Sequence, residues 1–144
     1  MNGAILIAED HEVARKSIQQ YLQREGYRVE EAADGDSAIE AINASDFDLV
    51  ITDLKMPSAN GLDVLKHVRE VSPNTLVIVT TAFGSVDSAI EALRLGAQDY
   101  VIKSSWNGAL LIKALGNANA RNGLSVQPEG DAASRGVDLD QSSL

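Results

Sequence analysis

The chain has 144 residues, a length that fits one domain with a substantial hydrophobic core. It is 44% hydrophobic and has no cysteine, which indicates a globular protein and excludes disulfides, thiolate metal sites and cysteine nucleophiles. A formal net charge of -9 argues against direct nucleic-acid binding, because phosphate contacts need clustered Lys and Arg. No apolar run reaches the length of about 18 residues that a membrane helix needs, and no signal peptide is evident, so we expect a cytoplasmic protein without a membrane partner.

Short β-rich runs alternate with amphipathic segments through most of the chain. The runs are residues 4–8, 27–32, 48–52, 75–80 and 99–102. Helical spacing of apolar residues follows each run, in residues 14–22, 38–42, 64–71, 86–93 and 110–118. Gly26 and Gly96 come just after two of these segments, where a left-handed helix C-cap is expected. This alternation predicts an α/β fold, a doubly wound five-stranded parallel sheet with helices on both faces.

The residues from Asn122 onward have a different composition from the rest of the chain. They include four acids against one base and almost no periodic apolar pattern. Such a segment cannot bury enough apolar surface to offset the entropy of ordering it. We therefore expect one domain over residues 1–121 and an acidic, disordered tail or linker over residues 122–144.

Polar side chains stand at the carboxyl ends of four of the predicted strands: Glu9 and Asp10, Asp53, Thr80 and Thr81, and Lys103. In open α/β sheets, ligands bind beyond these carboxyl ends, near the point where the strand order reverses. The predicted sheet therefore brings three carboxylates, a hydroxyl and an ammonium toward one small volume.

The three carboxylates predict a magnesium site. Acids that lie a few ångströms apart repel one another unless a cation neutralises them. Mg²⁺ prefers oxygen ligands and is commonly held by one or two carboxylates and several waters, which suits Glu9, Asp10 and Asp53. An aspartate in such a site can also act as a nucleophile toward phosphorus and form an aspartyl phosphate.

Ordinary structural roles are open for the same residues. Asp10 precedes an amphipathic run, and we expect it to cap the first helix as well as to bind metal. Asp53 taken alone could be a turn residue before a proline-containing loop. Thr80 and Thr81 compete for one role, because side chains alternate between the two faces of a strand.

Four motifs in order give the chain a family resemblance. They are "ILIAED" (5–10), "VITDLKMP" (50–57), "VIVTTAFG" (77–84) and "DYVIK" (99–103). Together they strongly resemble the receiver domain of two-component response regulators, over roughly residues 3–120. Each motif is weak alone, whereas all four at successive strand ends are specific. The resemblance implies a flavodoxin-like fold with strand order 2-1-3-4-5.

The resemblance implies phosphorylation of Asp53. The phosphoryl group would come from a phosphohistidine, so the expected partner is a sensor histidine kinase or a phosphotransfer protein. Asp10 and Asp53 would bind Mg²⁺ directly, Glu9 would act mainly through water, and the backbone carbonyl of Lys55 would add a ligand. The chain would then be a phosphoacceptor switch with its own phosphorylation and dephosphorylation chemistry, and not an enzyme.

The resemblance also implies how a signal would leave the site. Lys103 would pair with the phosphoryl group, and Thr81 would donate its hydroxyl to a phosphoryl oxygen. Inward rotation of Tyr100 would follow and change the face made by the fourth helix, fifth strand and fifth helix. An effector domain or partner protein would read this face. Residues 81–103 resemble receivers attached to transcriptional activators, so DNA binding is expected of another domain or chain.

One departure from the family pattern keeps an alternative open. Relatives commonly have a cis proline after the lysine, whereas Ser104 follows Lys103 here. A cis bond costs about 2.5–4 kcal/mol before a non-proline residue and about 0.5–1 kcal/mol before proline. A pseudo-receiver that signals by protein contacts without phosphate is therefore the alternative function. An aspartyl-phosphate phosphatase is disfavoured, because Lys55 stands where a second acid is needed and no cap domain is evident.

Overall fold

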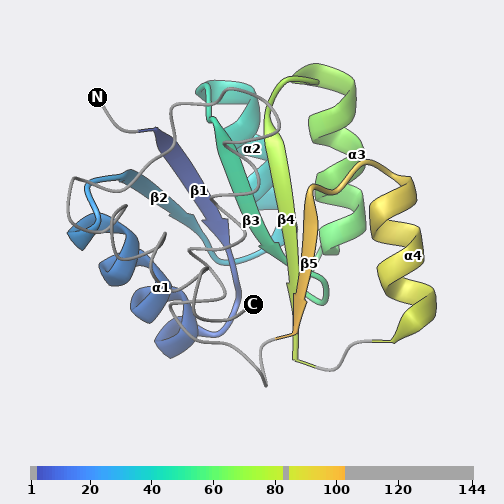
Figure 1. Cartoon of the computed structure of the whole chain (residues 1–144). Helices are drawn as coiled ribbons and strands as arrows, with labels where there is room; N and C mark the ends of the chain where they lie inside the picture. Colours follow the sequence, from blue (N-terminus) through green and yellow to red (C-terminus); the bar gives the residue numbers. More distant parts are fainter. Residues whose placement is uncertain (1–2, 83–84, 103–144) are drawn as a thin grey trace, which may run out of the picture.

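The computed structural model of the chain describes residues 3–82 and 85–102 (Figure 1). Strands and helices alternate strictly along these residues. In chain order the elements are β1 (Ala4–Ala8), α1 (Glu12–Arg24), β2 (Arg28–Ala32), α2 (Gly35–Ala44), β3 (Leu49–Asp53), α3 (Gly61–Val71), β4 (Leu76–Thr81), α4 (Val86–Arg94) and β5 (Asp99–Ile102). The helix expected at residues 110–118 and the tail expected at residues 122–144 lie outside the described residues.

The strands form one parallel sheet in the order β2-β1-β3-β4-β5, which confirms the predicted fold class and strand order. The chain runs from β1 outward to β2 and then crosses to β3 on the other side of β1. This reversal lies between β1 and β3, so the carboxyl ends of these two strands flank the position where α/β sheets bind ligands. The predicted strand bounds were correct to within one residue, and Asp53 is the last residue of β3 rather than the residue after it.

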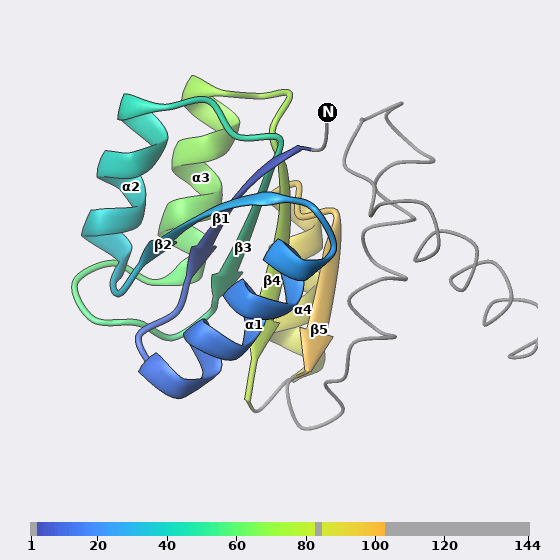
Figure 2. The same cartoon turned by 90° about the vertical axis from the view of Figure 1, so that its left-hand side faces the viewer.

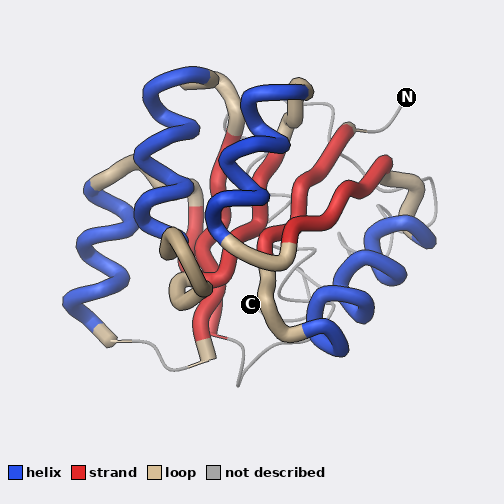
Figure 3. Tube along the Cα trace, turned by 180° about the vertical axis from the view of Figure 1, so that it is seen from behind, coloured by secondary structure: helices blue, strands red, loops and turns tan. Residues whose placement is uncertain are grey.

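Two apolar layers cover the sheet. Alternate residues of β1 and β3, such as Leu6 and Val50, pack with α2, α3 and α4 on one face. Their neighbours, such as Ile5 and Ile51, pack on the other face with α1. Figures 2 and 3 show α1 on the opposite side of the sheet from α2, α3 and α4. None of the four described helices combines the length and apolarity that crossing a bilayer requires.

Local sequence signals fix the helix ends. Asn60 and Asp63 form a capping box at the start of α3, in which each side chain accepts a hydrogen bond from the other residue's backbone N–H. Gly26 and Gly96 have positive φ angles of 99° and 103°, as expected for residues just beyond a helix end.

The expectation that Asp10 caps α1 was wrong. The N-cap is His11, whose backbone is extended and whose Nδ1 accepts a hydrogen bond from the N–H of Ala14 at 3.4 Å. Because α1 begins at Glu12, the capping position is that of the preceding residue, His11, and not that of Asp10. The Asp10 carboxylate lies instead beside the acids that end β1 and β3.

Helix α3 offers a test of how the layers stabilise the fold. Leu65 is fully buried, whereas Val71 near the end of the same helix is 49% exposed. Leu65→Ala is expected to lower the free energy of unfolding by about 3 kcal/mol, because it removes buried methyl groups and leaves a cavity. Val71→Ala is the matched control and should change it by less than about 0.5 kcal/mol. Urea unfolding measures both values, and equal losses would contradict the assignment of the buried face.

Candidate functional site

The strand register brings the predicted site residues to one edge of the sheet. Ala8 of β1 pairs with Thr52 of β3, so Glu9 follows β1 next to the position where Asp53 ends β3. Asp53 in turn pairs with Thr80 of β4. Parallel strands that end together deliver the residues at their carboxyl ends to the same edge.

Three carboxylates meet at this edge. One oxygen from each of Glu9, Asp10 and Asp53 lies within 4.8 Å of the other two. Glu9 and Asp53 are buried, with 2% and 8% of their surface exposed, and Asp10 is exposed at the mouth. All three offer hard oxygen donors in one small volume, which is the donor chemistry that Mg²⁺ prefers. The set therefore fits a magnesium ion.

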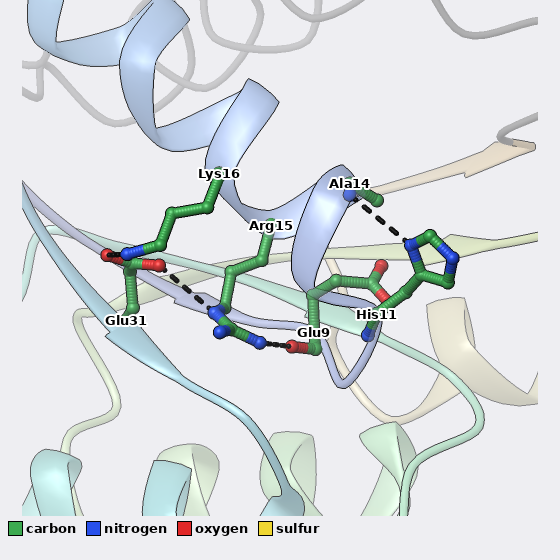
Figure 4. Close-up of polar contacts among 6 residues, drawn as sticks. All are labelled: Glu9, His11, Ala14, Arg15, Lys16 and Glu31. Carbon is green, nitrogen blue, oxygen red and sulfur yellow. Dashed lines mark hydrogen bonds and ion pairs between the residues drawn. The ribbon is translucent and has the colours of Figure 1, made fainter.

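Glu9 is held by its backbone and by its side chain. Its N–H donates to the carbonyl of Ala32 on β2 at 3.0 Å. Its carbonyl accepts a hydrogen bond from Nη1 of Arg15 at 2.9 Å (Figure 4). Its Oε2 accepts one from the backbone N–H of His11 at 3.0 Å, which stabilises the turn from β1 into α1. Glu9 is thereby fixed through two backbone groups as well as through its carboxylate.

The turn after β3 packs tightly against the backbone of Asp53. A Cβ on Gly61 would overlap the carbonyl oxygen of Asp53, so only glycine fits at the start of α3. The N–H of Gly61 donates to the carbonyl of Leu54 at 2.8 Å, and the N–H of Leu54 donates to the carbonyl of Thr80 at 2.8 Å. The bond to Thr80 continues the β3–β4 ladder one residue beyond Asp53, and the bond to Leu54 ties the start of α3 to the same turn. Lys55, whose carbonyl was predicted to bind metal, follows in this turn with an exposed side chain.

The two candidate threonines of β4 are both buried. The hydroxyl of Thr80 donates to the carbonyl of Thr52 at 3.4 Å and is thus directed to the neighbouring strand. Thr81 pairs with Ile102 of β5 in the sheet register. The donor role expected of Thr81 stays a prediction.

Tyr100 on β5 is half-buried and joined to α4. Its hydroxyl lies 2.6 Å from Oγ of Ser88. Ser88 belongs to the capping box that starts α4, together with Ser85. Ser88 therefore links Tyr100 on β5 to the first turn of α4. Lys103 lies outside the described residues, as does its bond to Ser104.

An ion-pair network beside the site was not anticipated from the sequence. Glu31 of β2 binds Nε of Arg15 and Nζ of Lys16, each at 3.0 Å (Figure 4). The sequence did contain a signal for this network, namely an acid within a predicted strand. An acid that becomes partly buried there needs a cationic partner. The sequence does not say which base supplies it, since several lie within reach of β2.

A protein-family comparison agrees with this geometry. The model of the response regulator receiver domain matches residues 5–115. The chain belongs to the response regulator receiver domain family. Receiver domains are signalling phosphoacceptors rather than enzymes in the usual sense, and an acidic pocket such as that of Glu9, Asp10 and Asp53 is typical of their phosphoacceptor and Mg²⁺ site.

Individual relatives of this receiver include transcriptional regulatory proteins and a chemotaxis protein. The chain is 39% identical to the transcriptional regulatory protein ZraR of Klebsiella oxytoca over 69% of this chain and 22% of ZraR. It is 34% identical to the chemotaxis protein CheY of Thermotoga maritima over 72% of this chain and 87% of CheY. A CheY-like receiver domain protein from Methanospirillum hungatei superposes with a TM-score of 0.78 and 28% identity, covering 84% of this chain and 97% of that one. The chain spans less than half the length of several curated relatives.

The packing of Gly61 against Asp53 gives a testable consequence. Gly61→Ala is expected to lower the free energy of unfolding by about 2 kcal/mol, because the added methyl group forces the backbone of Asp53 to move. Asn60→Ala is the control, since it removes the adjacent helix cap at a cost of about 1 kcal/mol without touching Asp53. Backbone NMR should show the Asp53 and Leu54 amide resonances shifting in Gly61→Ala only. Unmoved resonances in that variant would argue against the close contact.

The ion pairs of Glu31 predict a pH-dependent stability. Burial alone would raise the pKa of Glu31, but hydrogen bonds and charges from Lys16 and Arg15 outweigh it and leave the pKa below its ordinary value. Because the folded-state pKa is lowered, the stabilisation is complete above the ordinary glutamate pKa and is lost as the pH falls through the lowered value.

Glu31→Gln should therefore cost about 1 kcal/mol of unfolding free energy at neutral pH, and less as the pH falls toward about 3. Glu30→Gln, at the exposed neighbouring position of β2, is the control and should have almost no effect. Urea unfolding at a series of pH values measures both. A cost for Glu31→Gln that does not depend on pH would contradict the ionic origin.

Proposed function

We propose that the chain is a phosphorylation-driven switch in two-component signalling, with Asp53 as the phosphoacceptor. The observation that carries the proposal is the cluster of three carboxylates at the sheet edge where the strand order reverses. Asp53 is the acid that ends a central strand: it pairs with Thr80 of β4, and the preceding residue, Thr52, pairs with Ala8 of β1. A nucleophile needs this kind of fixed position, because phosphoryl transfer depends mostly on alignment and charge neutralisation.

The proposed reaction transfers a phosphoryl group from a histidine to Asp53. Receiver domains pair with histidine kinases, so the donor is a phosphohistidine on such a kinase or on a phosphotransfer protein. A carboxylate oxygen of Asp53 forms a bond to phosphorus while the bond from phosphorus to the imidazole nitrogen breaks. The imidazole leaves with the electron pair of that bond and takes up a proton. No electron donor or acceptor is required.

The residues around Asp53 suit the ion that such chemistry uses. In this proposal Asp10 and Asp53 would bind Mg²⁺ directly, Glu9 would act mainly through water, and the carbonyl of Lys55 would add a ligand. When bound, Mg²⁺ neutralises the charge on the phosphoryl oxygens. Glu9 is buried with its carboxylate already accepting from His11, which supports an indirect contact for this residue.

Signal output is proposed to pass through β4 and β5. Thr81 donates its hydroxyl to a phosphoryl oxygen, Lys103 pairs with another, and Tyr100 rotates inward. The Tyr100 hydroxyl shares Ser88 with the start of α4, which supports a change in α4 when Tyr100 moves. An effector domain or partner protein would read the face that includes α4 and β5. Relatives named as transcriptional regulatory proteins favour control of transcription.

A second candidate is a pseudo-receiver that signals without phosphate. Ser104 after Lys103 favours it, because a cis bond that would aim the lysine costs more before serine than before proline. The acidic cluster argues for the first candidate, since a purely structural role would not require three acids to remain together. The two candidates differ in one measurable property, the covalent gain of phosphate.

Incubation with acetyl phosphate and Mg²⁺ tests the proposed function. Intact mass spectrometry should show the gain of one phosphoryl group by the wild-type chain. Asp53→Asn should abolish the gain, because the amide is not a nucleophile. Asp36→Asn is the matched control, since Asp36 is an exposed acid in α2 outside the cluster, and it should be phosphorylated normally. An unchanged wild-type mass favours the pseudo-receiver, and a phosphorylated Asp53→Asn variant excludes Asp53 as the acceptor.

A further inference from the structure

Arg15 of α1 reaches back across the turn that carries two of the clustered acids. Its Nη1 donates to the backbone carbonyl of Glu9 at 2.9 Å, and its Nε donates to Oε1 of Glu31 at 3.0 Å (Figure 4). Only 13% of its side chain is exposed. A guanidinium held at two points in a fixed fork has little freedom to move. Arg15 therefore connects β2, α1 and the end of β1 through a single rigid group.

The contacts of Arg15 complete a bracket around Glu9. The N–H of Glu9 is bound to β2 through Ala32, and its carbonyl is bound to α1 through Arg15. Peptide groups on both sides of its Cα are thus fixed. The carbonyl that Arg15 binds belongs to the peptide group between Glu9 and Asp10. Because a peptide group is planar, fixing this carbonyl also fixes the orientation of the Asp10 N–H. Asp10 itself is exposed and has less packing to define its position.

We propose that Arg15 is a positioning residue that holds the Glu9–Asp10 peptide in the orientation required for binding Mg²⁺. The inference rests on the proposed function, since it concerns the same ion. Arg15 does not touch the reacting atoms. Its role resembles that of the hydrogen-bonding partners behind metal ligands in other proteins, whose loss typically weakens metal affinity by about 10- to 100-fold.

Lys16 is a natural comparison residue for this role. It is the next residue of α1, carries the same charge and binds the other carboxylate oxygen of Glu31 at 3.0 Å. Its side chain is 48% exposed, so it is less constrained than that of Arg15. Replacing either base removes one positive charge and one bond to Glu31. Replacing Arg15 also removes the bond to the Glu9 carbonyl.

The sign of the effect separates positioning from simple electrostatics. Removing a cation near an acidic pocket strengthens the attraction for Mg²⁺, because the local potential becomes more negative. Loss of a positioning contact weakens Mg²⁺ binding. A variant that loses charge and yet binds Mg²⁺ less tightly therefore reports a loss of geometry.

The test is an NMR titration of backbone amide resonances with MgCl₂ for the wild-type chain, Arg15→Gln and Lys16→Gln. The apparent Kd of Arg15→Gln should rise by about 10-fold. That of Lys16→Gln should stay within about twofold of wild type or fall slightly, because an exposed charge is screened by solvent and salt. Amide hydrogen exchange at Asp10 should become faster in Arg15→Gln alone, and resonances far from the site report whether each variant is folded.

Two results would overturn the proposal. One is an Arg15→Gln variant with a wild-type Kd, and the other is an equal shift of Kd in Arg15→Gln and Lys16→Gln. If Arg15→Gln does not fold, Arg15→Lys replaces it. This variant keeps the charge but loses the fork, and a Kd no weaker than that of Lys16→Gln then overturns the proposal.

The wild-type titration separates this inference from the proposed function. A wild-type chain that binds no Mg²⁺ and gains no phosphoryl group contradicts the function and the role of Arg15 together. If the wild-type chain binds Mg²⁺ but no more tightly than the Arg15 variants, the result contradicts only the role of Arg15.

Discussion

The parallel pairing of β1 with β3 is the constraint on which the site depends. Both strands run in the same direction and end side by side, so the acids at their ends cannot separate without breaking main-chain hydrogen bonds. Three carboxylates consequently stay within 4.8 Å of one another, although like charges repel. Hydrophobic burial offsets this repulsion, because β1 and β3 are covered on both faces. The resulting concentration of negative charge explains why this edge suits a divalent cation.

Two turns convert the sheet edge into a fixed site. The turn after β1 is bound to β2 and α1 through the two peptide groups that flank Glu9. The turn after β3 is pressed against Asp53 by Gly61, where a larger residue does not fit. The contacts at the two peptide groups of Glu9 and at Gly61 do not involve the clustered carboxylates, so they do not change with the protonation or ligation of the acids. The site is thus organised before any ion or phosphoryl group arrives, which reduces the reorganisation that binding requires.

The link that we propose between the site and the surface is of a different kind. The hydroxyl of Tyr100 is hydrogen-bonded to Ser88, and Ser88 also belongs to the capping box of α4, whose N-cap is Ser85. A side-chain bond between half-buried groups is easier to exchange than a main-chain ladder. Helix α4 also exposes Val86, Ile90 and Leu93, so a change at its first turn would alter an apolar surface. The acids therefore lie where main-chain hydrogen bonds hold the strands, and the change that we propose lies in side-chain contacts between β5 and α4.

The sequence by itself determined the fold class, the strand order through the family resemblance, and the set of acids that meet, because period-two and helical patterns place these residues at strand ends. Glu9, Asp10 and Asp53 were all identified in this way, and Gly26 and Gly96 were identified as helix C-caps. Only the tertiary structure decided which residue caps α1 and which two bases neutralise Glu31. These outcomes depend on where a helix starts to within one residue and on which long side chain crosses between elements. Patterns along a chain report which face a residue occupies, whereas partners from distant segments are chosen by three-dimensional packing.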